Sequence, residues 1–477
     1  MLNLIFFFIM TKIKFGTDGW RAIIAQDFTV DNVARVTEAT SKWLLKQHKT
    51  PTVIVGHDCR FGGHLFAETT TKVFIANGIK VFLAHDFVST PMISLGCVKY
   101  KTHLGIIITA SHNPPAYNGY KIKGNYGGPL GPEYVQEIED MISDTHTANW
   151  KAINLDDAKA KGQLEIAPLE EVYIKHVEEN FDLTAIKTSG LNLAYDAMFG
   201  AGQRVMKRLF PEIHKLHCDD NPGFNGQAPE PIHKNLTEFS SFIKSNGTIS
   251  CGLATDGDAD RIGLYDAKGN FVDSHHIILL LIHYLVKYKK MTGKVVVAFS
   301  VTVRLKKMCE HYGLKLEVVK IGFKYICSIM VKDDVLLGGE ESGGIAIKGH
   351  IPERDGIWMG LTIWEFMAKT GKTLEELIEE VYAITGPFCF ERNDLHIDDT
   401  IKNKVLQNCQ NNAYKEFGSY KVQRVDDLDG YKFFFDDNTW MMIRASGTEP
   451  VLRVYAEAAS QEIANDILAN TKKILLA

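Results

Sequence analysis

Four short segments of the chain carry residue types that could do chemistry together. The first runs from Thr109 to Pro115 and places Ser111 in a rigid turn after the apolar run 104–108, so its hydroxyl is a candidate nucleophile. On local grounds alone, a serine ahead of a proline-rich turn is more often a turn former or a helix cap. Three later segments make the chemical interpretation stronger, namely 255–261, 338–344 and 444–450.

Asp256, Asp258 and Asp260 occupy alternate positions in the second segment. Their carboxylates would repel one another if they packed together without a cation, and such oxygen ligands suit Mg²⁺ or Ca²⁺. The spacing excludes an EF-hand, because position six counted from Asp256 is Arg261 rather than glycine and position twelve is Ala267 rather than glutamate. Three carboxylates also leave room for an oxygen of a phosphorylated group. The alternative is a solvated acidic turn between two strands.

The other two segments favour a phosphorylated sugar. Arg444 begins a segment with two hydroxyls and a glycine that permits a backbone nest, and Arg453 could join it in binding phosphate oxygens. In segment 338–344, four glycines let a ligand approach the backbone, while Glu340 and Ser342 can bond neighbouring hydroxyl groups. A tight turn with an incidental arginine and a plain glycine-rich turn are the alternatives.

Two further basic residues could serve a reacting phosphate. Arg21 ends the glycine-rich turn that starts at Phe15, and Lys121 lies ten residues after Ser111. Each of them, considered singly, is more often a solvated surface charge.

The elements that must position these segments follow an α/β pattern, in which short apolar runs alternate with longer amphipathic stretches. The runs 53–56 and 104–108 are typical of buried strands, whereas 31–47 and 63–77 have helical spacing. The same theme recurs twice further along the chain, and the C-terminal part reads as an α+β unit ending in a helix. We therefore predict four units with the boundaries 1–155, 156–271, 272–385 and 386–477.

Composition narrows the class of protein. The net charge of −5 and the lack of a basic stripe argue against nucleic acid as a partner. Eight scattered cysteines without a CxxC pair argue against a zinc site and favour a reducing compartment, so we expect a cytoplasmic protein. The apolar start, 2–10, lacks a basic region and a cleavage site and is too short to span a membrane, and we hypothesise that residues 1–9 are a spurious upstream extension.

The four segments, in this order, resemble the α-D-phosphohexomutase family of phosphoglucomutases and phosphomannomutases, and the likeness extends from Ile13 onward. The family has a phosphoserine loop of TASHNP type, a DGDADR metal loop, a GEESGG-type sugar loop and an R-x-SGTEP phosphate loop, and each is nearly verbatim here. The resemblance implies three related α/β domains with mixed sheets and a C-terminal α+β domain around a central cleft.

The resemblance also implies a role for each matching residue. Ser111 would be phosphorylated and would bind Mg²⁺ together with Asp256, Asp258 and Asp260. Lys121 is a candidate for general acid/base work, because a lysine near a cation can have a lowered pKa. Further catalytic candidates are Arg21 and His112. Candidates for substrate binding are Arg261, Gly322, Lys324, Glu340, Ser342, His350 and Arg354. Those for phosphate binding are Arg444, Ser446, Gly447, Thr448 and Arg453.

The activity implied is the interconversion of hexose 1-phosphate and hexose 6-phosphate through a phosphoserine enzyme and a bound hexose 1,6-bisphosphate. Gly344 stands where some family members have histidine, so the choice of sugar is not transferred, and phosphoglucosamine mutase and phosphopentomutase stay open. A phosphatase that uses the same serine and a non-catalytic sugar-phosphate-binding protein are rival interpretations. We expect sugar phosphates as the partners, no nucleic acid, no membrane, and a monomer or homodimer.

Overall fold

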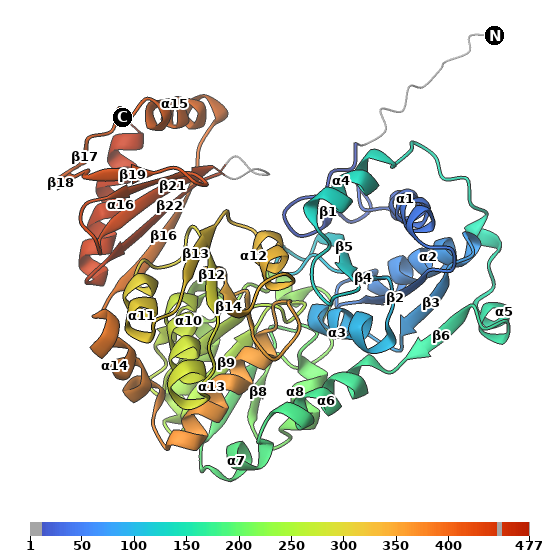
Figure 1. The fold of residues 1–477 in the computed structure, drawn as a ribbon, viewed down its shortest axis with the longest axis horizontal. Coiled ribbons are helices and arrows are strands. Elements are labelled where there is room, and N and C mark those ends of the chain that lie inside the picture. The colour runs from blue at the N-terminus through green and yellow to red at the C-terminus, as the bar shows by residue number, and fades with distance from the viewer. Residues whose placement is uncertain (1–11, 446–450, 477) are drawn as a thin grey trace.

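The computed structural model describes residues 12–445 and 451–476, and it shows three α/β units followed by a C-terminal α+β unit (Figure 1). The predicted fold class is therefore confirmed. Residues 1–9, the hypothesised extension, lie outside the described residues.

The first unit is built on a six-stranded mixed sheet. Its strand β4 is buried at all five positions, as expected of a strand covered on both faces. Across the sheet the strands are β1 (Trp20–Ile23), β5 (Tyr117–Gly124), β4 (Leu104–Ile108), β2 (Thr52–His57), β3 (Lys80–Ala84) and β6 (Leu164–Ala167). The helices are α1 (Val30–Gln47), α2 (Gly63–Ala76), α3 (Thr90–Tyr100), α4 (Pro132–Asp140), η1 (Trp150–Ala152) and α5 (Leu155–Ala160).

Strand β6 lies beyond residue 155, the first predicted boundary. It pairs in parallel with β3, so the first sheet includes a strand from the predicted second unit. Its two central residues are exposed, as on the outer strand of a sheet, and four residues of this kind carry a weak apolar pattern. We propose that the first unit extends to Ala167.

The second unit has a five-stranded sheet, and the third has a four-stranded one. Their strands are, across the sheets, β11 (Phe271–Val272), β10 (Ile262–Tyr265), β9 (Cys251–Thr255), β7 (Leu193–Asp196) and β8 (His214–Leu216), then β13 (Leu316–Val319), β12 (Lys294–Ala298), β14 (Val335–Gly339) and β15 (Ile345–Ile347). Their helices are α6 (Leu169–Asn180), α7 (Leu183–Thr188), α8 (Gln203–Leu209), η2 (Phe224–Gly226), η3 (His233–Asn235), α9 (Thr237–Asn246), α10 (Ser274–His283), η4 (Tyr284–Tyr288), α11 (Leu305–Tyr312), α12 (Phe323–Met330), α13 (Gly356–Thr370) and α14 (Leu374–Thr385).

One strand order is shared by the three α/β units. It reads β5-β4-β2-β3 in the first, β10-β9-β7-β8 in the second and β15-β14-β12-β13 in the third. Of these four strands in each unit, three neighbours are parallel, and the fourth pairs antiparallel with its neighbour to form a hairpin. The hairpin loops after β4, β9 and β14 therefore hold equivalent places, and they contain Ser111, the three aspartates and Glu340 respectively.

The C-terminal unit is an antiparallel sheet with two helices, one after its first strand and one after its last. Its strands run β16 (Cys389–His396), β22 (Val451–Ala458), β21 (Trp440–Ala445), β20 (Tyr431–Phe434) and β19 (Arg424–Asp426), with a small hairpin of β17 (Glu416–Phe417) and β18 (Tyr420–Lys421) and the helices α15 (Asp399–Gln410) and α16 (Gln461–Leu475). Buried aromatic residues, Phe299 of the third unit with Phe434 and Trp440, join this sheet to the rest.

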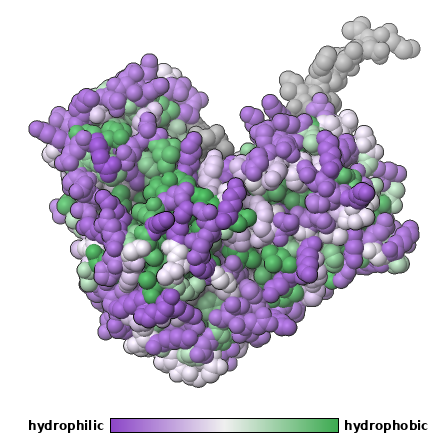
Figure 2. Space-filling model, in the orientation of Figure 1, coloured by the Kyte–Doolittle hydropathy of each residue, from purple (hydrophilic) through white to green (hydrophobic). Residues whose placement is uncertain are grey.

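The visible surface is largely hydrophilic (Figure 2), in agreement with the 23% of charged residues in the sequence. The outline of the face seen in Figure 2 is indented between the C-terminal unit and the first unit. Within residues 12–445 and 451–476, we find no helix that combines the length and the apolar character needed to cross a membrane.

Candidate active site

Ser111 lies in the loop that follows the buried strand β4. Its backbone has φ 53°, a left-handed conformation that is uncommon for residues other than glycine. Its N–H donates to the hydroxyl of Thr109 at 2.9 Å, and that hydroxyl donates to Asp58 Oδ2 at 2.5 Å. The side chain is fully buried, so the loop holds the hydroxyl in one place.

Arg60, which follows β2, fixes the remainder of this loop. Its guanidinium is buried and donates to four backbone carbonyls, those of Ser111, Asn113, Pro114 and Tyr117, at 2.6 to 3.1 Å. Arg60 also lies 3.5 Å from Asp58, which offsets its charge. A planar fork of donors suits this task because it can bind several carbonyls at once.

The aspartate loop meets the serine loop directly. Ser111 Oγ donates to Asp256 Oδ2 at 2.7 Å, and Asp256 Oδ1 accepts the backbone N–H groups of Asp260 and Arg261 at 2.9 and 3.0 Å. Gly257 makes the approach possible, since a Cβ there would lie 2.6 Å from the Ser111 carbonyl oxygen. The two hairpin loops are thus in contact through both backbone and side chains.

The three aspartates fit a hard cation. Each offers one oxygen, and these oxygens lie within 4.8 Å of one another. Oδ1 of Asp258 and Oδ1 of Asp260 are buried without a hydrogen-bond partner among the described residues, although buried carboxylate oxygens are normally paired. Burial, followed by the charges of Asp258 and Asp260, raises the pKa of Asp256 well above its usual value. All three observations fit a hard cation such as Mg²⁺ held by these carboxylates.

Lys121 occupies the other side of the aspartate trio. Its ammonium lies 2.7 Å from Asp258 Oδ2, 3.1 Å from Asp260 Oδ2 and 2.8 Å from Asp18 Oδ2. Burial acts to lower the pKa of Lys121, but the three carboxylates raise it above its ordinary value. The three carboxylates thus act against the lowered pKa that the sequence suggested, and the acid/base role of Lys121 stays a prediction.

Asp18 ties Lys121 to the third unit. Arg354 Nη2 lies 2.5 Å from Asp18 Oδ2 and 2.7 Å from Asp260 Oδ2, so a single guanidinium bridges residues of the first and second units. Burial acts to raise the pKa of Asp18, but the nearby cations, Arg354 first and Lys121 next, hold it well below its usual range. The Asp18 carboxylate therefore stays ionised and pairs with both Lys121 and Arg354.

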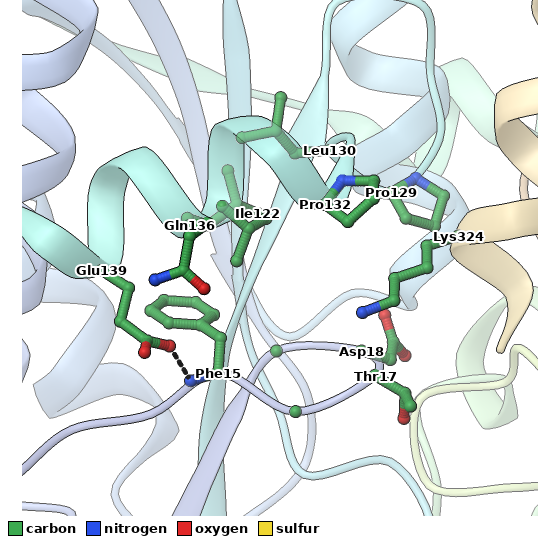
Figure 3. Close-up of a pocket in the computed structure, with 13 residues that line it drawn as sticks. Phe15, Thr17, Asp18, Ile122, Pro129, Leu130, Pro132, Gln136, Glu139 and Lys324 are labelled. Carbon is green, nitrogen blue, oxygen red and sulfur yellow. Dashed lines mark hydrogen bonds between the residues drawn. The ribbon is translucent and has the colours of Figure 1, made fainter.

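A small cavity of about 90 Å³ lies beside Asp18, at the turn formed by residues 15–19. Figure 3 shows the Lys324 amine pointing across it toward Asp18, with Phe15 on the opposite side. The Phe15 N–H donates to Glu139 Oε2 at 2.7 Å and anchors the turn. Lys324 therefore stands at the edge of the site, on the first turn of α12.

His112 and Arg21 complete the surroundings of the serine. His112 Nδ1 lies 3.3 Å from Ser111 Oγ. Burial, followed by the charges of Arg261 and Arg21, holds the pKa of His112 well below its ordinary value, so the imidazole is neutral. Arg21 donates to the side-chain oxygen of Asn113 at 2.8 Å and so lies against the serine loop.

The segment 338–344, the candidate sugar loop, joins the aspartate loop through a backbone bridge between Arg261 and Gly344. Glu340 Oε1 accepts the N–H of Gly322 at 3.0 Å, and burial raises the pKa of Glu340 to about 7. A Cβ at Gly344 would lie 2.5 Å from Arg354 Cδ, so the arginine fills the space of a side chain at that position. Ser342 is half-buried in the same turn.

Arg444 and Arg453 lie directly opposite each other on β21 and β22. Like charges in that relation destabilise an antiparallel pair. Arg444 donates to Asp429 at 3.3 Å, whereas Arg453 Nε is buried with no hydrogen-bond partner among the described residues. An anion between the two guanidinium groups would offset this repulsion. The other phosphate-binding candidates, Ser446, Gly447 and Thr448, lie outside the described residues.

His350 is not brought into this cluster. Its buried ring stacks on Trp358 at 3.8 Å, Nε2 lies 2.9 Å from Asp355 Oδ2, and Nδ1 lies 3.3 Å from His176 Nε2. Asp355 caps α13 by accepting the N–H of Trp358. These contacts bury both ring nitrogens away from a ligand, so the structure favours a packing role over the expected contact with substrate.

Four residues of the site were missed in the sequence. Asp58 and Arg60 follow strand β2, at the same carboxyl edge as the serine loop, and this position was an available signal. Thr90, which donates to Asp258 Oδ2 at 2.5 Å, and Asp18 carried no distinguishing pattern. Their roles depend on contacts with residues far away in the chain.

Comparisons with known proteins match this arrangement. Models of the family described as phosphoglucomutase/phosphomannomutase match alpha/beta/alpha domain I at residues 12–149, domain II at 171–269, domain III at 273–384 and the C-terminal domain at 404–474.

Individual relatives span most of the chain. A phosphoglucomutase/phosphomannomutase of Thermococcus kodakarensis is 29% identical over 97% of this chain and 98% of its own. A phosphoglucosamine mutase of Methanococcus maripaludis is 30% identical over 87% and 90%. The crystal structure of a Thermus thermophilus protein named as a phosphomannomutase aligns with a TM-score of 0.86 and 33% identity, over 98% of this chain and 100% of that one. The resemblance seen in the four sequence segments is confirmed, and the chain belongs to the α-D-phosphohexomutase family.

Proposed function

We propose that the protein interconverts hexose 1-phosphate and hexose 6-phosphate, with phosphorylated Ser111 as the donor and hexose 1,6-bisphosphate as the bound intermediate. The observation that carries this proposal is the contact of Ser111 Oγ with Asp256 Oδ2 at 2.7 Å, inside a buried cluster of matched charges. A buried serine facing three aspartates suits the transfer of a phosphoryl group more than it suits simple binding.

The first half of the reaction moves the phosphoryl group from Ser111 Oγ to the free 6-hydroxyl of the sugar. The bond from phosphorus to the serine oxygen breaks while a bond to the sugar oxygen forms, and the hydroxyl proton needs an acceptor. That proton must end on the serine oxygen as it leaves, and His112 Nδ1, which lies 3.3 Å from Ser111 Oγ, is our candidate to deliver it there. Arg21 and Lys121 supply positive charge for the transferring oxygens.

When bound by the three aspartates, Mg²⁺ would add charge neutralisation on the same oxygens. Asp258 and Asp260 each direct one oxygen to Lys121 and keep the other free of hydrogen bonds, which leaves them ready to hold the ion. Lys121 therefore orients the carboxylates for the metal.

The second half needs the sugar to turn over, so that its 1-phosphate faces Ser111 and returns to the enzyme. The phosphate that is not reacting must then be held elsewhere in both orientations. We assign this task to Arg444 and Arg453, which are direct cross-strand partners and would repel each other less with an anion between them. Glu340, Ser342 and Lys324 are our candidates for contacts with the sugar and its phosphate.

Phosphoglucosamine mutase is the second candidate, because the relative of Methanococcus maripaludis carries that name. Gly344 and the Arg354 side chain beside it give this sugar loop a cation near Glu340. A panel of glucose, mannose, glucosamine and ribose 1-phosphates, compared by kcat/KM, separates the candidate substrates.

The test of the general function is an assay of glucose 1-phosphate with Mg²⁺ and a trace of glucose 1,6-bisphosphate. Formation of glucose 6-phosphate supports the mutase. Release of inorganic phosphate without isomerisation would indicate a phosphatase, and binding of the sugar phosphate without turnover would indicate a sensor. We also propose a cytoplasmic location and a monomer or homodimer as the working form.

A further inference from the structure

A second glutamate of the sugar loop contacts the C-terminal sheet. Glu341 follows Glu340, and its Oε2 accepts the Ser300 hydroxyl at 3.1 Å. On the other side, Glu341 Oε1 lies 3.8 Å from Nη1 of Arg392, which belongs to β16. The Glu341 side chain is 9% exposed and that of Arg392 is 26% exposed, so this contact is partly removed from water. The sugar loop is therefore tied to the C-terminal unit by a charged pair.

Arg392 is held firmly from its own strand. Its Nε donates to Asp394 Oδ1 at 2.8 Å and its Nη2 donates to Asp394 Oδ2 at 2.6 Å, which is a bidentate pair. Because the two residues are two positions apart on β16, they share one face of the sheet. This geometry keeps the remaining amine of Arg392 directed at Glu341.

Asp394 extends the row to the arginines that we assign to phosphate. It lies opposite Arg453 in the pairing of β16 with β22, and its Oδ1 is 4.0 Å from Arg453 Nε. Arg453 in turn lies opposite Arg444. The charges along the row alternate from Glu341 to Arg453 and then meet a second cation, Arg444, which is also paired with Asp429. An anion between the two arginines would continue the alternation.

We propose that Glu341, Arg392 and Asp394 are positioning residues that couple the sugar loop to phosphate binding by Arg444 and Arg453. This inference depends on the phosphate role given to those arginines under the proposed function.

The physical reason is the orientation of Arg453. Asp394 Oδ1 lies 4.0 Å from Arg453 Nε and can hold that guanidinium in one orientation toward a phosphate. Arg392 fixes Asp394 through the bidentate pair, and Glu341 fixes Arg392, so loss of either contact lets Asp394 and Arg453 move. Coupling of this kind is reciprocal, so contact with the sugar loop should strengthen the binding of phosphate.

The test is isothermal titration of the whole protein with inorganic phosphate, in the absence of sugar. The decrease in phosphate affinity that Arg444→Ala causes measures the share of the binding that Arg444 and Arg453 contribute. We expect Glu341→Gln, which keeps the shape of the side chain, to weaken that share about three- to fivefold, the range for partly exposed charge pairs. Arg392→Lys keeps the charge but loses the bidentate geometry, and it should also weaken the binding.

Glu391→Gln is the matched control. Glu391 neighbours Arg392 on β16 but accepts a hydrogen bond from Gln461, so its loss should leave phosphate affinity unchanged. If Arg444→Ala weakens binding while Glu341→Gln and Arg392→Lys do not, the coupling is refuted and the phosphate site stands. If Arg444→Ala itself has no effect, the phosphate site fails and the coupling fails with it.

In turnover, the account predicts a higher KM for the sugar 1-phosphate in Glu341→Gln, with kcat nearly unchanged. A loss of stability alone would lower the amount of active enzyme and so reduce the apparent kcat without raising KM. A variant with a lower kcat and an unchanged KM would therefore contradict the positioning role.

Discussion

A Cβ atom at Gly257 would lie 2.6 Å from the carbonyl oxygen of Ser111. The aspartate loop and the serine loop thus approach more closely than any side chain at this position permits, and Asp256 reaches the serine hydroxyl as a result. Gly257→Ala should push the two loops apart and lower kcat about a hundredfold, because catalysis is sensitive to displacements of about 1 Å. Steady-state kinetics of the variant will measure this.

The matched control is Gly223→Ala, since a Cβ there has a neighbour no closer than 3.4 Å and the backbone φ is −93°. Its activity should equal that of the wild type. A fully active Gly257→Ala enzyme would contradict the close approach of the loops.

Arg60 supports the serine loop without being expected to touch the substrate, because its donors are used by four backbone carbonyls. Arg60→Lys loses the planar fork and should lower kcat about tenfold or more. Arg35→Lys is a suitable control, since Arg35 is a buried arginine that donates to the Ser143 carbonyl far from the site. Both variants should melt at lower temperature, but only Arg60→Lys should lose kcat per folded molecule. Equal kcat in the two would refute the positioning role.

Asp260 should be needed for the metal. Its Oδ1 is buried and unpartnered in the described structure, and Asp260→Asn removes a negative charge from the trio. We expect Mg²⁺ affinity, measured by direct titration as well as by activity, to fall at least about tenfold. Asp266→Asn changes a buried carboxylate of the next turn and should leave Mg²⁺ affinity unchanged. Equal affinities for Asp260→Asn and the wild type would contradict the assignment.

His176 should make stability depend on pH. Burial, followed by the charge of His350, lowers the pKa of His176 from 6.5 to about 4. Between these pH values the unfolded chain binds a proton that the folded protein does not, so the free energy of unfolding falls as the pH drops from 6.5 to 4 and is fully retained above 6.5. Since the ring is half-buried, we expect the free energy of unfolding of His176→Gln to fall by about 1 kcal/mol less than that of the wild type between pH 6.5 and 4. Urea unfolding at several pH values measures the difference, and identical pH dependence would refute the prediction.

Much of the fold and the centre of the site could be predicted from sequence, for local reasons. The run 104–108 is apolar at each position except Gly105 because β4 is covered on both faces, and the helix predicted at 31–47 is α1 within one residue. Ser111, Asp256 and Glu340 stood out because each belongs to a short loop of unusual composition after such a strand.

The remainder depends on contacts between distant residues. Lys121 carries no local sign that three carboxylates surround it, and those carboxylates act against the expected lowering of its pKa. His350 lies in a segment like those of the family, yet Trp358 and Asp355 enclose its ring. Asp18 became recognisable only when the fold placed Arg354, which is 336 residues away, within 2.5 Å.

The central claim is that Ser111 carries the phosphoryl group between the two ends of one sugar. The most direct measurement is mass spectrometry of the protein after incubation with glucose 1,6-bisphosphate and Mg²⁺, with peptide mapping, followed by addition of glucose 6-phosphate. The account predicts one phosphoryl group on Ser111, its loss to the added sugar, and neither event in Ser111→Ala. Isomerisation by Ser111→Ala, or a phosphoryl group found on another residue during turnover, would contradict it.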